Sequence, residues 1–195
     1  MAVIGEFDAI VLAGGRGSRL GAPSKPDLQI GGRRLLDIAL AAVAAARQVV
    51  VVGPVDVPDG VIRIREDPPF GGPVAGVDAG FAALTGHAPW TLLLACDLPG
   101  AEAAVRRLLA AEPGAEHDGA CLLDVGGRRQ WLLGCYRSQA LAGRLADRGD
   151  PPLTAMYRLL EPLNLLGVAA PAGCVDDVDT PADVVRWLAA LAAER

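Results

Sequence analysis

The sequence predicts an α/β fold with a mainly parallel central sheet, helices on both faces and a small antiparallel excursion. Short apolar runs alternate along the chain with longer helical patterns, as they do in parallel sheets covered on both sides. After residue 118 this alternation loosens, and two apolar runs joined by a turn-rich segment indicate an antiparallel pair. The length of 195 residues, 52% of them hydrophobic, is typical of one domain over residues 1–195.

Each element follows from a local pattern. Short β-branched or leucine-rich runs bounded by glycine, proline or polar residues predict strands at 7–13, 48–53, 61–65, 90–96, 119–125, 130–137 and 163–169. Longer stretches of good helix formers predict helices at 35–47, 73–84, 101–112, 138–148, 154–160 and 181–194. The helix at 73–84 begins with a proline, which suits a first turn. Together these elements predict a Rossmann-like arrangement of three layers, α/β/α.

Composition excludes several classes of protein. A net charge of −5 argues against a nucleic-acid partner, and no run reaches the ~18 apolar residues that a membrane span requires. The N-terminus lacks the basic region of a secretory signal, so we expect a cytoplasmic protein with no membrane partner. Its four cysteines are far apart and form no CxxC pair, which predicts reduced core residues. The oligomeric state is not readable, and a monomer is the simplest expectation.

A glycine-rich, cationic stretch follows the first predicted strand. Residues 12–26 read LAGGRGSRLGAPSKP, with four glycines, two arginines and one lysine. Ligands of open α/β sheets bind beyond the carboxyl ends of the strands, where this stretch begins. Glycines let backbone N–H groups approach an anion closely, and Arg and Lys add positive charge. The stretch therefore predicts a cradle for a polyphosphate.

Two familiar phosphate motifs do not fit this stretch. No lysine follows Gly21, so the pattern GxxxxGK[ST] is absent, and Leu20 stands where GxGxxG needs its last glycine. Asp37 lies inside a predicted helix rather than at the end of a second strand. A long surface loop with incidental arginines is the alternative interpretation.

Asp97 follows the buried run TLLLAC, which places its carboxylate at the carboxyl end of a strand. Mg²⁺ prefers oxygen ligands and keeps several waters, so one or two carboxylates beside a polyphosphate suffice to hold it. The alternative is a helix N-cap, a common role for aspartate. Residues 98–100 separate Asp97 from the next helix and weaken that alternative.

The segment CVDDVDTPADV near the C-terminus combines a capping pattern with further acids. Thr180 suits the N-cap, Pro181 the first helical position, and Asp183 the helix dipole. This pattern does not explain Asp177 and Asp179, which precede the cap. Capping and a second metal ligand can coexist here.

Two further segments leave alternatives open. In GPVAG, either Gly71, Gly72 and the helix N-terminus face an anion, or the segment only starts a helix. Gly76 and Gly80, one turn apart, predict close packing of that helix on the sheet. In GGRRQW, Arg128 and Arg129 are either solvated at a hairpin tip or contact an anionic substrate.

The chain resembles the molybdenum cofactor guanylyltransferases in four segments that follow one another in the family's order. LAGGRGSRLGAPSKP matches the LAGGxxxRMGxxK-type signature of nucleotidyltransferases, with Leu20 for the usual Met. EDPPFGGPVAGVDAG resembles the family's GPLAG-type segment. LLLACDLP and DVDTPADV are similar to its metal-site and closing motifs. The resemblance implies a single nucleotidyltransferase domain of the nucleotide-diphospho-sugar transferase type.

The resemblance implies a role for each matching residue. Leu12, Ala13 and Gly14 would contact base and ribose, and Gly15, Arg16, Gly17 and Ser18 would wrap the β- and γ-phosphates. Arg19, Lys25 and Asp97 would be the catalytic residues, the two cations neutralising the triphosphate. Asp67 and Gly72 would lie near the nucleotide, and Asp97 and Asp179 would bind Mg²⁺.

The resemblance also implies an activity, the transfer of GMP from GTP to molybdopterin with release of pyrophosphate. The sequence departs from the family at three places, which leaves base and acceptor open. Gln130-Trp131 replaces the usual His-Pro, Asp177 and Asp179 stand in an often asparagine-rich motif, and Gly53 replaces a polar residue. A cytidylyltransferase of the same fold, an enzyme with another phosphorylated acceptor, and an inactive nucleotide-binding regulator are the alternatives.

Overall fold

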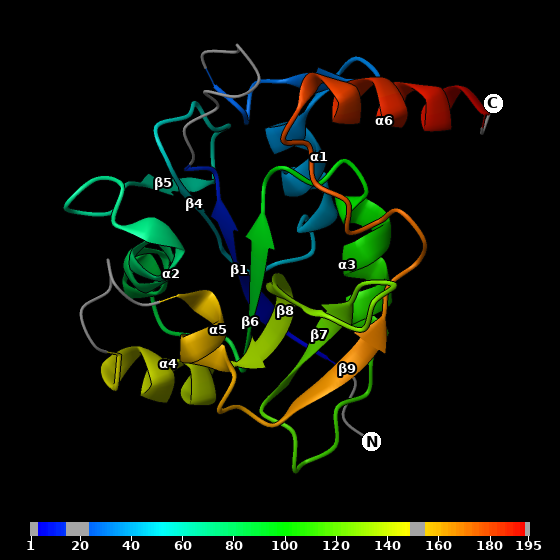
Figure 1. Ribbon diagram of the computed structural model, residues 1–195. Coiled ribbons are helices and arrows are strands. Elements are labelled where there is room, and N and C mark those ends of the chain that lie inside the picture. Colours follow the sequence, from blue (N-terminus) through cyan, green and yellow to red (C-terminus); the bar gives the residue numbers. More distant parts are fainter. Residues whose placement is uncertain (1–3, 15–23, 149–154, 194–195) are drawn as a thin grey trace.

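The structure is a computed structural model that describes residues 4–14, 24–148 and 155–193 (Figure 1). Its strands are β1 (Phe7–Leu12), β2 (Gln29–Ile30), β3 (Arg33–Arg34), β4 (Val49–Val52), β5 (Ile62–Ile64), β6 (Trp90–Ala95), β7 (Gly119–Leu123), β8 (Arg129–Arg137) and β9 (Leu165–Ala169). Its helices are α1 (Leu35–Ala42), α2 (Gly72–Ala83), α3 (Ala101–Leu109), α4 (Ser138–Ala146), α5 (Met156–Leu160) and α6 (Pro181–Ala193).

Seven strands form the central sheet in the order β5-β4-β1-β6-β8-β7-β9. Pairings β4–β5, β1–β4, β1–β6 and β7–β9 are parallel, whereas β8 runs antiparallel to both of its neighbours, β6 and β7. The predicted fold class is confirmed, including the antiparallel excursion, which consists of β8. The parallel strands point their carboxyl ends to one edge of the sheet, where α/β proteins bind ligands.

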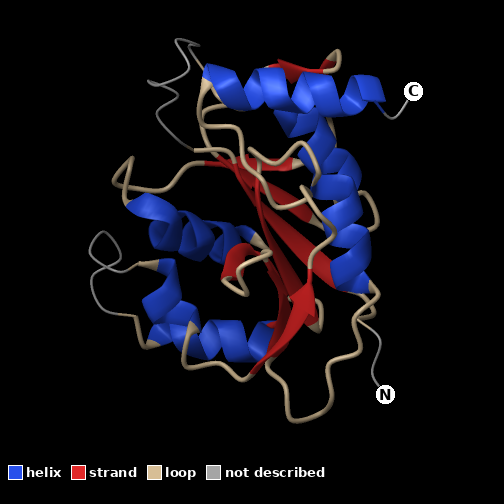
Figure 2. Ribbon diagram, turned by 45° about the vertical axis from the view of Figure 1, so that its right-hand side comes forward, coloured by secondary structure: helices blue, strands red, loops and turns tan. Residues whose placement is uncertain are grey.

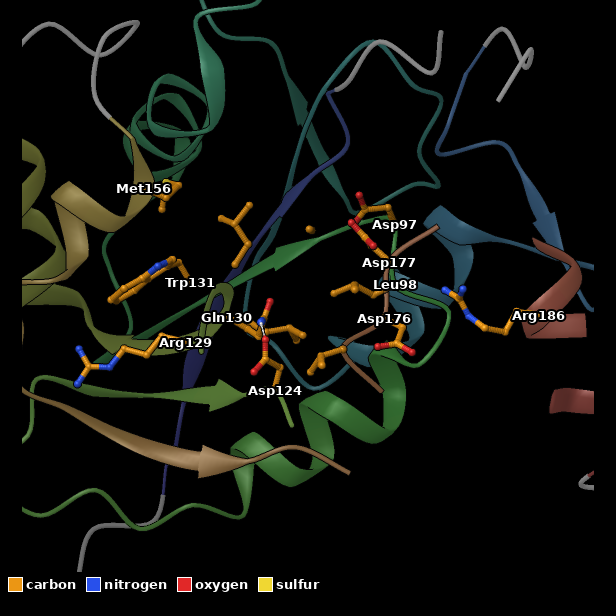
Figure 3. Close-up of a pocket in the computed structure, with 14 residues that line it drawn as sticks. Asp97, Leu98, Asp124, Arg129, Gln130, Trp131, Met156, Asp176, Asp177 and Arg186 are labelled. Carbon is orange, nitrogen blue, oxygen red and sulfur yellow. Dashed lines mark hydrogen bonds between the residues drawn. The ribbon is translucent and has the colours of Figure 1, made fainter. Parts of the chain in front are cut away.

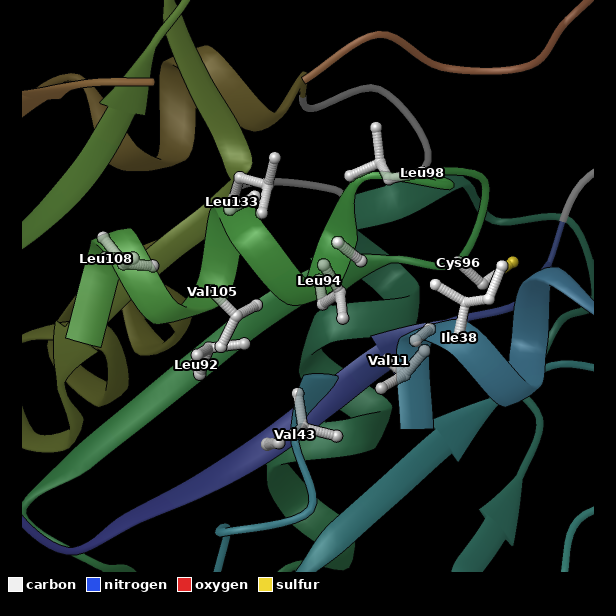
Figure 4. Close-up of a cluster of buried hydrophobic side chains, with 14 of the residues drawn as sticks. Val11, Ile38, Val43, Leu92, Leu94, Cys96, Leu98, Val105, Leu108 and Leu133 are labelled. Atoms are coloured by element: carbon white, nitrogen blue, oxygen red, sulfur yellow. The ribbon is translucent and has the colours of Figure 1, made fainter. Parts of the chain in front are cut away.

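Helices cover both faces of this sheet (Figure 2). Side chains of α1 and α3 pack on one face with Val11, Leu92 and Leu94 (Figure 4). On the other face, α2, α4 and α5 pack against Ile10 and Leu93. Successive residues of β1 and β6 thus enter opposite cores, as the two-residue period of a strand requires. Cys96, Cys121 and Cys135 are buried in these cores as predicted, and Cys174 is half-buried.

The short hairpin β2–β3 was not predicted from the sequence. Gly31 and Gly32 form its turn with φ of 60° and 83°, a conformation that glycine adopts readily. A Cβ on Gly31 would lie 3.0 Å from Leu191 of α6, so the hairpin packs directly against that helix. Figure 1 shows α6 at the top of the molecule, beside this hairpin. The Gly-Gly pair was the available signal, but two-residue strands lack the alternation that identifies longer ones.

Helix α1 ends at Ala42, five residues before the predicted end at 47. Beyond Ala42 the chain leaves the helical path, and Arg47 pairs with a buried residue of β1. Its guanidinium donates two hydrogen bonds, of 3.0 and 2.9 Å, to the carboxylate of Asp8, which is fully buried in β1. A buried carboxylate without a cationic partner is costly, so this pair outweighs the helix propensity of the alanines.

Glycines set the distance between α2 and the sheet, as predicted. A Cβ on Gly80 would lie 2.5 Å from Cγ2 of Ile10 and 3.1 Å from Cγ2 of Val52. A Cβ on Gly76 would lie 3.1 Å from Leu12. Because neither glycine has a side chain, α2 lies directly against β1 and β4. This brings the N-terminus of α2 close to the end of β1.

We expect Gly80→Ala to lower the free energy of unfolding. Overpacking costs about 1–3 kcal/mol, which exceeds the ~0.5–1 kcal/mol gained by replacing a glycine within a helix. The matched control is Gly143→Ala in α4, where an added Cβ meets no atom within 4 Å. Urea denaturation should show the control to be slightly more stable than the parent protein. If Gly80→Ala were also stabilised, close packing of α2 would be contradicted.

Candidate active site

Two cavities, of about 610 and 600 Å³, lie at the carboxyl edge of the sheet and meet at Asp97. Three residues line both of them, Ala95, Asp97 and Leu132. We call the first the β1 cavity, because the end of β1 lines it together with residues of β4 and α2. We call the second the β8 cavity, because residues 129–133 of β8 form one of its walls. A pair of cavities that share a carboxylate suits a reaction between two substrates.

With the exception of Asp67, the predicted nucleotide contacts that the structure describes line the β1 cavity. Leu12, Ala13, Gly14 and Gly72 line it. Further lining residues are Lys25, Pro26, Val52, Pro54, Arg65, Glu66, Phe70, Pro73, Gly76, Cys96 and Asp179. A Cβ on Gly53 would lie 2.5 Å from the Ala13 carbonyl oxygen, so glycine there permits the close approach of the two strand ends. Gly15, Arg16, Gly17, Ser18 and Arg19 lie outside the described residues, and their roles stay predictions.

In the segment that begins EDPP, the residue that lines the β1 cavity is Glu66 rather than Asp67. Asp67 is exposed and is not among the described residues of the cavity wall. Glu66 accepts a hydrogen bond of 3.0 Å from the backbone N–H of Phe70. The guanidinium of Arg65 lies 5.1 Å from the centre of the Phe70 ring. Glu66, one position earlier in the chain, is therefore a better-placed candidate than Asp67 for a contact with the nucleotide.

Lys25 joins two predicted metal ligands that are far apart in the sequence. Its Nζ donates hydrogen bonds of 2.7 Å to Oδ2 of Asp97 and 2.6 Å to Oδ1 of Asp179. The Lys25 side chain is 13% exposed. Burial alone would lower the pKa of Lys25, but the hydrogen bonds and charges of Asp179 and Asp97 outweigh it and raise that pKa. Lys25 is the only lysine in the sequence.

Backbone contacts explain how Asp179 reaches Asp97. The N–H of Val178 donates to the carbonyl of Asp97 at 3.1 Å, and the Val178 side chain is fully buried. A Cβ on Gly100 would lie 2.7 Å from Cα of Cys174, so glycine lets the C-terminal segment pass close to the loop after β6. Because Val178 points into the core, its neighbours Asp177 and Asp179 both point away from it.

The cap of α6 fixes this segment further. Oδ2 of Asp183 accepts hydrogen bonds from the backbone N–H of Thr180 at 2.7 Å and of Asp179 at 3.0 Å. The Asp183 N–H donates to Oγ1 of Thr180 at 3.3 Å, which completes a capping box. The predicted cap is confirmed, and it also orients the residue that bonds Lys25. The cap leaves the Asp179 carboxylate free to bond Lys25, and its role as a metal ligand stays a prediction.

Among the described residues, Asp97, Asp177 and Asp179 form a group able to hold a cation. Each offers one carboxylate oxygen, and these oxygens lie within 4.8 Å of one another. Burial, followed by the charges of Asp179 and Asp97, raises the pKa of Asp177. Three carboxylates at one point favour a cation between them, and hard oxygen donors suit Mg²⁺. Asp177 was not predicted as a metal ligand, although its spacing of two from Asp179 was a usable signal.

The β8 cavity is lined by both apolar and polar side chains (Figure 3). Trp131, Met156, Leu98, Leu133 and Val175 form its apolar part. Arg129, Gln130, Asp124, Asp176, Asp177 and Arg186 add polar groups. Of the two arginines whose role was open, Arg129 lines this cavity, whereas Arg128 is exposed and does not.

Comparison with known proteins identifies the family. The sequence profile of the MobA-like NTP transferase domain matches residues 9–165, most of the chain. The chain belongs to this family. As a MobA-like nucleotidyltransferase, it takes a nucleoside triphosphate as substrate.

Relatives of this MobA-like domain cover nearly the whole chain. A probable molybdenum cofactor guanylyltransferase of Bacillus thuringiensis (strain Al Hakam) is 28% identical to this chain. The match covers 91% of this chain and 88% of the length of that protein. A structure titled molybdopterin-guanine dinucleotide biosynthesis protein A, from Archaeoglobus fulgidus, has a TM-score of 0.70 at 18% identity. It covers 95% of this chain and 99% of that one.

Another structure similar to this chain in fold is 2-C-methyl-D-erythritol 4-phosphate cytidylyltransferase from Thermus thermophilus. Its TM-score is 0.68 at 21% identity, over 95% of this chain and 98% of that one. These structural likenesses show the fold that the sequence predicted. Among the described residues, no helix has the length and apolar character needed to cross a bilayer.

Proposed function

We propose that this MobA-like enzyme transfers GMP from GTP to a molybdopterin acceptor and releases pyrophosphate. The observation that carries the proposal is the meeting of two cavities at Asp97, beside Lys25. GTP occupies the β1 cavity, with its base and ribose against Leu12, Ala13 and Gly14. The acceptor occupies the β8 cavity. The reacting groups then meet at the residues common to both.

In the proposed reaction, an oxygen of the acceptor phosphate attacks the α-phosphorus of GTP in line. A new bond forms between that oxygen and the α-phosphorus, and the bond from the α-phosphorus to the bridging oxygen of pyrophosphate breaks. The leaving group departs with the electron pair of that bond. The attacking oxygen is already anionic, so no general base is needed. The protein contributes alignment and charge stabilisation, which suffice for phosphoryl chemistry.

The residues around Asp97 fit a magnesium ion. Asp97 and Asp179 would hold it, with Asp177 nearby as a third oxygen donor. When bound, Mg²⁺ neutralises charge on the reacting phosphates. Lys25 lies at the wall of the β1 cavity with its ammonium beside these carboxylates. There it counters the charge that develops on the departing pyrophosphate, as Arg16 and Arg19 would by the sequence prediction.

The choice of GTP and molybdopterin is supported by the relatives named guanylyltransferase and by the four matched motifs. A cytidylyltransferase activity is the second candidate, because an enzyme of that kind shares the fold at nearly the same TM-score. A nucleotide-binding regulator without catalysis is the third.

Nucleotide binding separates the first two candidates. We expect calorimetry with Mg²⁺ present to give the tightest binding for GTP, with CTP, ATP and UTP at least about tenfold weaker, because base contacts are worth at least ~1.4 kcal/mol. Tightest binding of CTP would overturn the guanylyltransferase assignment. Pyrophosphate release from GTP in the presence of molybdopterin, and its absence without an acceptor, separates an enzyme from a regulator.

A further inference from the structure

The wall of the β8 cavity contains an irregularity in the sheet. Along β7, Cys121 and Leu122 are neighbours, but their partners on β8 are Gly134 and Gln130. Residues 131–133 of β8 therefore have no partner on β7 and form a bulge. All three of them line the β8 cavity. Bulges beside active sites commonly re-aim side chains, and this one presents Trp131 and Leu132 to the cavity.

A buried tyrosine holds the bulge in place. The hydroxyl of Tyr136 donates a hydrogen bond of 2.7 Å to the carbonyl of Trp131. Tyr136 is fully buried, and its ring occupies the space that a Cβ on Gly134 would need. Glycine at 134 thus lets the tyrosine fold back along its own strand. The carbonyl that the bulge removes from the sheet is satisfied by this bond, which fixes the backbone of Trp131.

Polar groups next to Trp131 are also fixed. Oδ1 of Asp124 accepts hydrogen bonds from the backbone N–H groups of Gly126 at 2.8 Å and Arg128 at 2.9 Å. Its Oδ2 accepts a bond of 3.2 Å from the Gln130 side chain. The guanidinium of Arg129 lies 5.6 Å from the centre of the Trp131 ring. Figure 3 shows these side chains along one wall of the cavity, with Met156 beyond the tryptophan.

We infer that Trp131 is the stacking platform for a planar nitrogen heterocycle of the acceptor, and that Tyr136 and Gly134 position it. This inference rests on the proposed function, because it assigns the acceptor's ring to the β8 cavity. A large flat side chain beside a guanidinium suits an aromatic ring, and rings of this kind stack favourably. The fixed carboxylate of Asp124 suits the ring N–H and amino donors of a pterin, which carries both.

The test uses the full-length protein and free pterin as the probe. Trp131→Leu removes the platform, and the matched control Trp187→Phe removes a tryptophan of α6 that lines neither cavity among the described residues. Pterin should quench the tryptophan fluorescence of the parent and of Trp187→Phe, and should lose that quenching in Trp131→Leu. The control retains Trp131 and should therefore keep the quenching. Absorption of light by the probe is the same in all samples, so it cancels when the variants are compared.

Kinetics supply a second readout. Trp131→Leu should raise the KM for the acceptor at least about tenfold, in line with the strength of aromatic stacking, and leave the affinity for GTP unchanged. Tyr136→Phe should raise the same KM by a smaller factor with kcat preserved. A loss confined to kcat would mean that the tyrosine serves only general structure, and would overturn its positioning role.

Failure of this inference is distinguishable from failure of the proposed function. If GTP binds with Mg²⁺ but pterin does not quench Trp131, the platform is overturned and the nucleotide assignment stands. If GTP quenches Trp131 and pterin does not, the nucleotide rather than the acceptor occupies the β8 cavity, and both are overturned. Quenching by pterin without any binding of GTP supports the platform and contradicts the nucleotide assignment.

Discussion

Asp97→Asn will lower turnover by about a thousandfold or more while the protein still binds nucleotide. The substitution keeps the shape of the side chain and removes the charge common to both cavities. Stabilisation of phosphate charge by a bound divalent ion is worth several kcal/mol, and ~4 kcal/mol corresponds to about a thousandfold in rate. The measurement is pyrophosphate release from GTP with the acceptor present, paired with calorimetry of GTP.

A matched control for Asp97→Asn is Asp59→Asn, which removes an exposed carboxylate from the loop between β4 and β5. It should have the turnover of the parent protein. Normal turnover of Asp97→Asn would refute the assignment of Asp97. Equal loss in both variants would point to an effect of net charge rather than to the site.

Lys25→Met will bind Mn²⁺ more tightly than the parent in the absence of nucleotide, and will be at least about a hundredfold slower in turnover. In the parent, the ammonium bonds Asp97 and Asp179 and so competes with any cation for their oxygens. Methionine keeps the unbranched side chain as far as Cε and leaves the three carboxylates without that ammonium group. Turnover falls because a charge that stabilises the transition state is lost, and one such donor is commonly worth 10²–10³, as an order of magnitude.

Electron paramagnetic resonance of free Mn²⁺ measures the first effect directly and does not depend on activity. Arg63→Met is the control, because Arg63 is an exposed cation paired with Asp56, away from the three carboxylates. It should leave Mn²⁺ affinity as in the parent. Weaker Mn²⁺ binding in Lys25→Met would contradict competition between the ammonium and the metal.

The elements of the central sheet could be predicted because their signals are local and strong. Runs such as QVVVV and TLLLA are long enough to show burial, and the helices between them are rich in alanine and leucine. The hairpin β2–β3 was missed because two residues per strand carry no periodic signal. The early end of α1 was missed because its cause, the buried Asp8, lies 39 residues away from Arg47.

The candidate site was predictable by residue type but not by arrangement. Asp97 and Lys25 stood out from their positions after a strand and in a cationic loop, and the structure joins them through one hydrogen bond. Asp177 and Glu66 were not assigned, because their approach to the cavities depends on the course of backbone segments far from them in sequence. The bulge at 131–133 could not be predicted either, because it arises from the register between β7 and β8.

A crystal structure with Mg²⁺ and a GTP analogue that resists cleavage between the α- and β-phosphates tests the central claim most directly. We expect the base and ribose to lie against residues 12–14, the triphosphate beside Lys25, and the metal between Asp97 and Asp179. Nucleotide density in the β8 cavity, or a metal bound away from these two carboxylates, would contradict it.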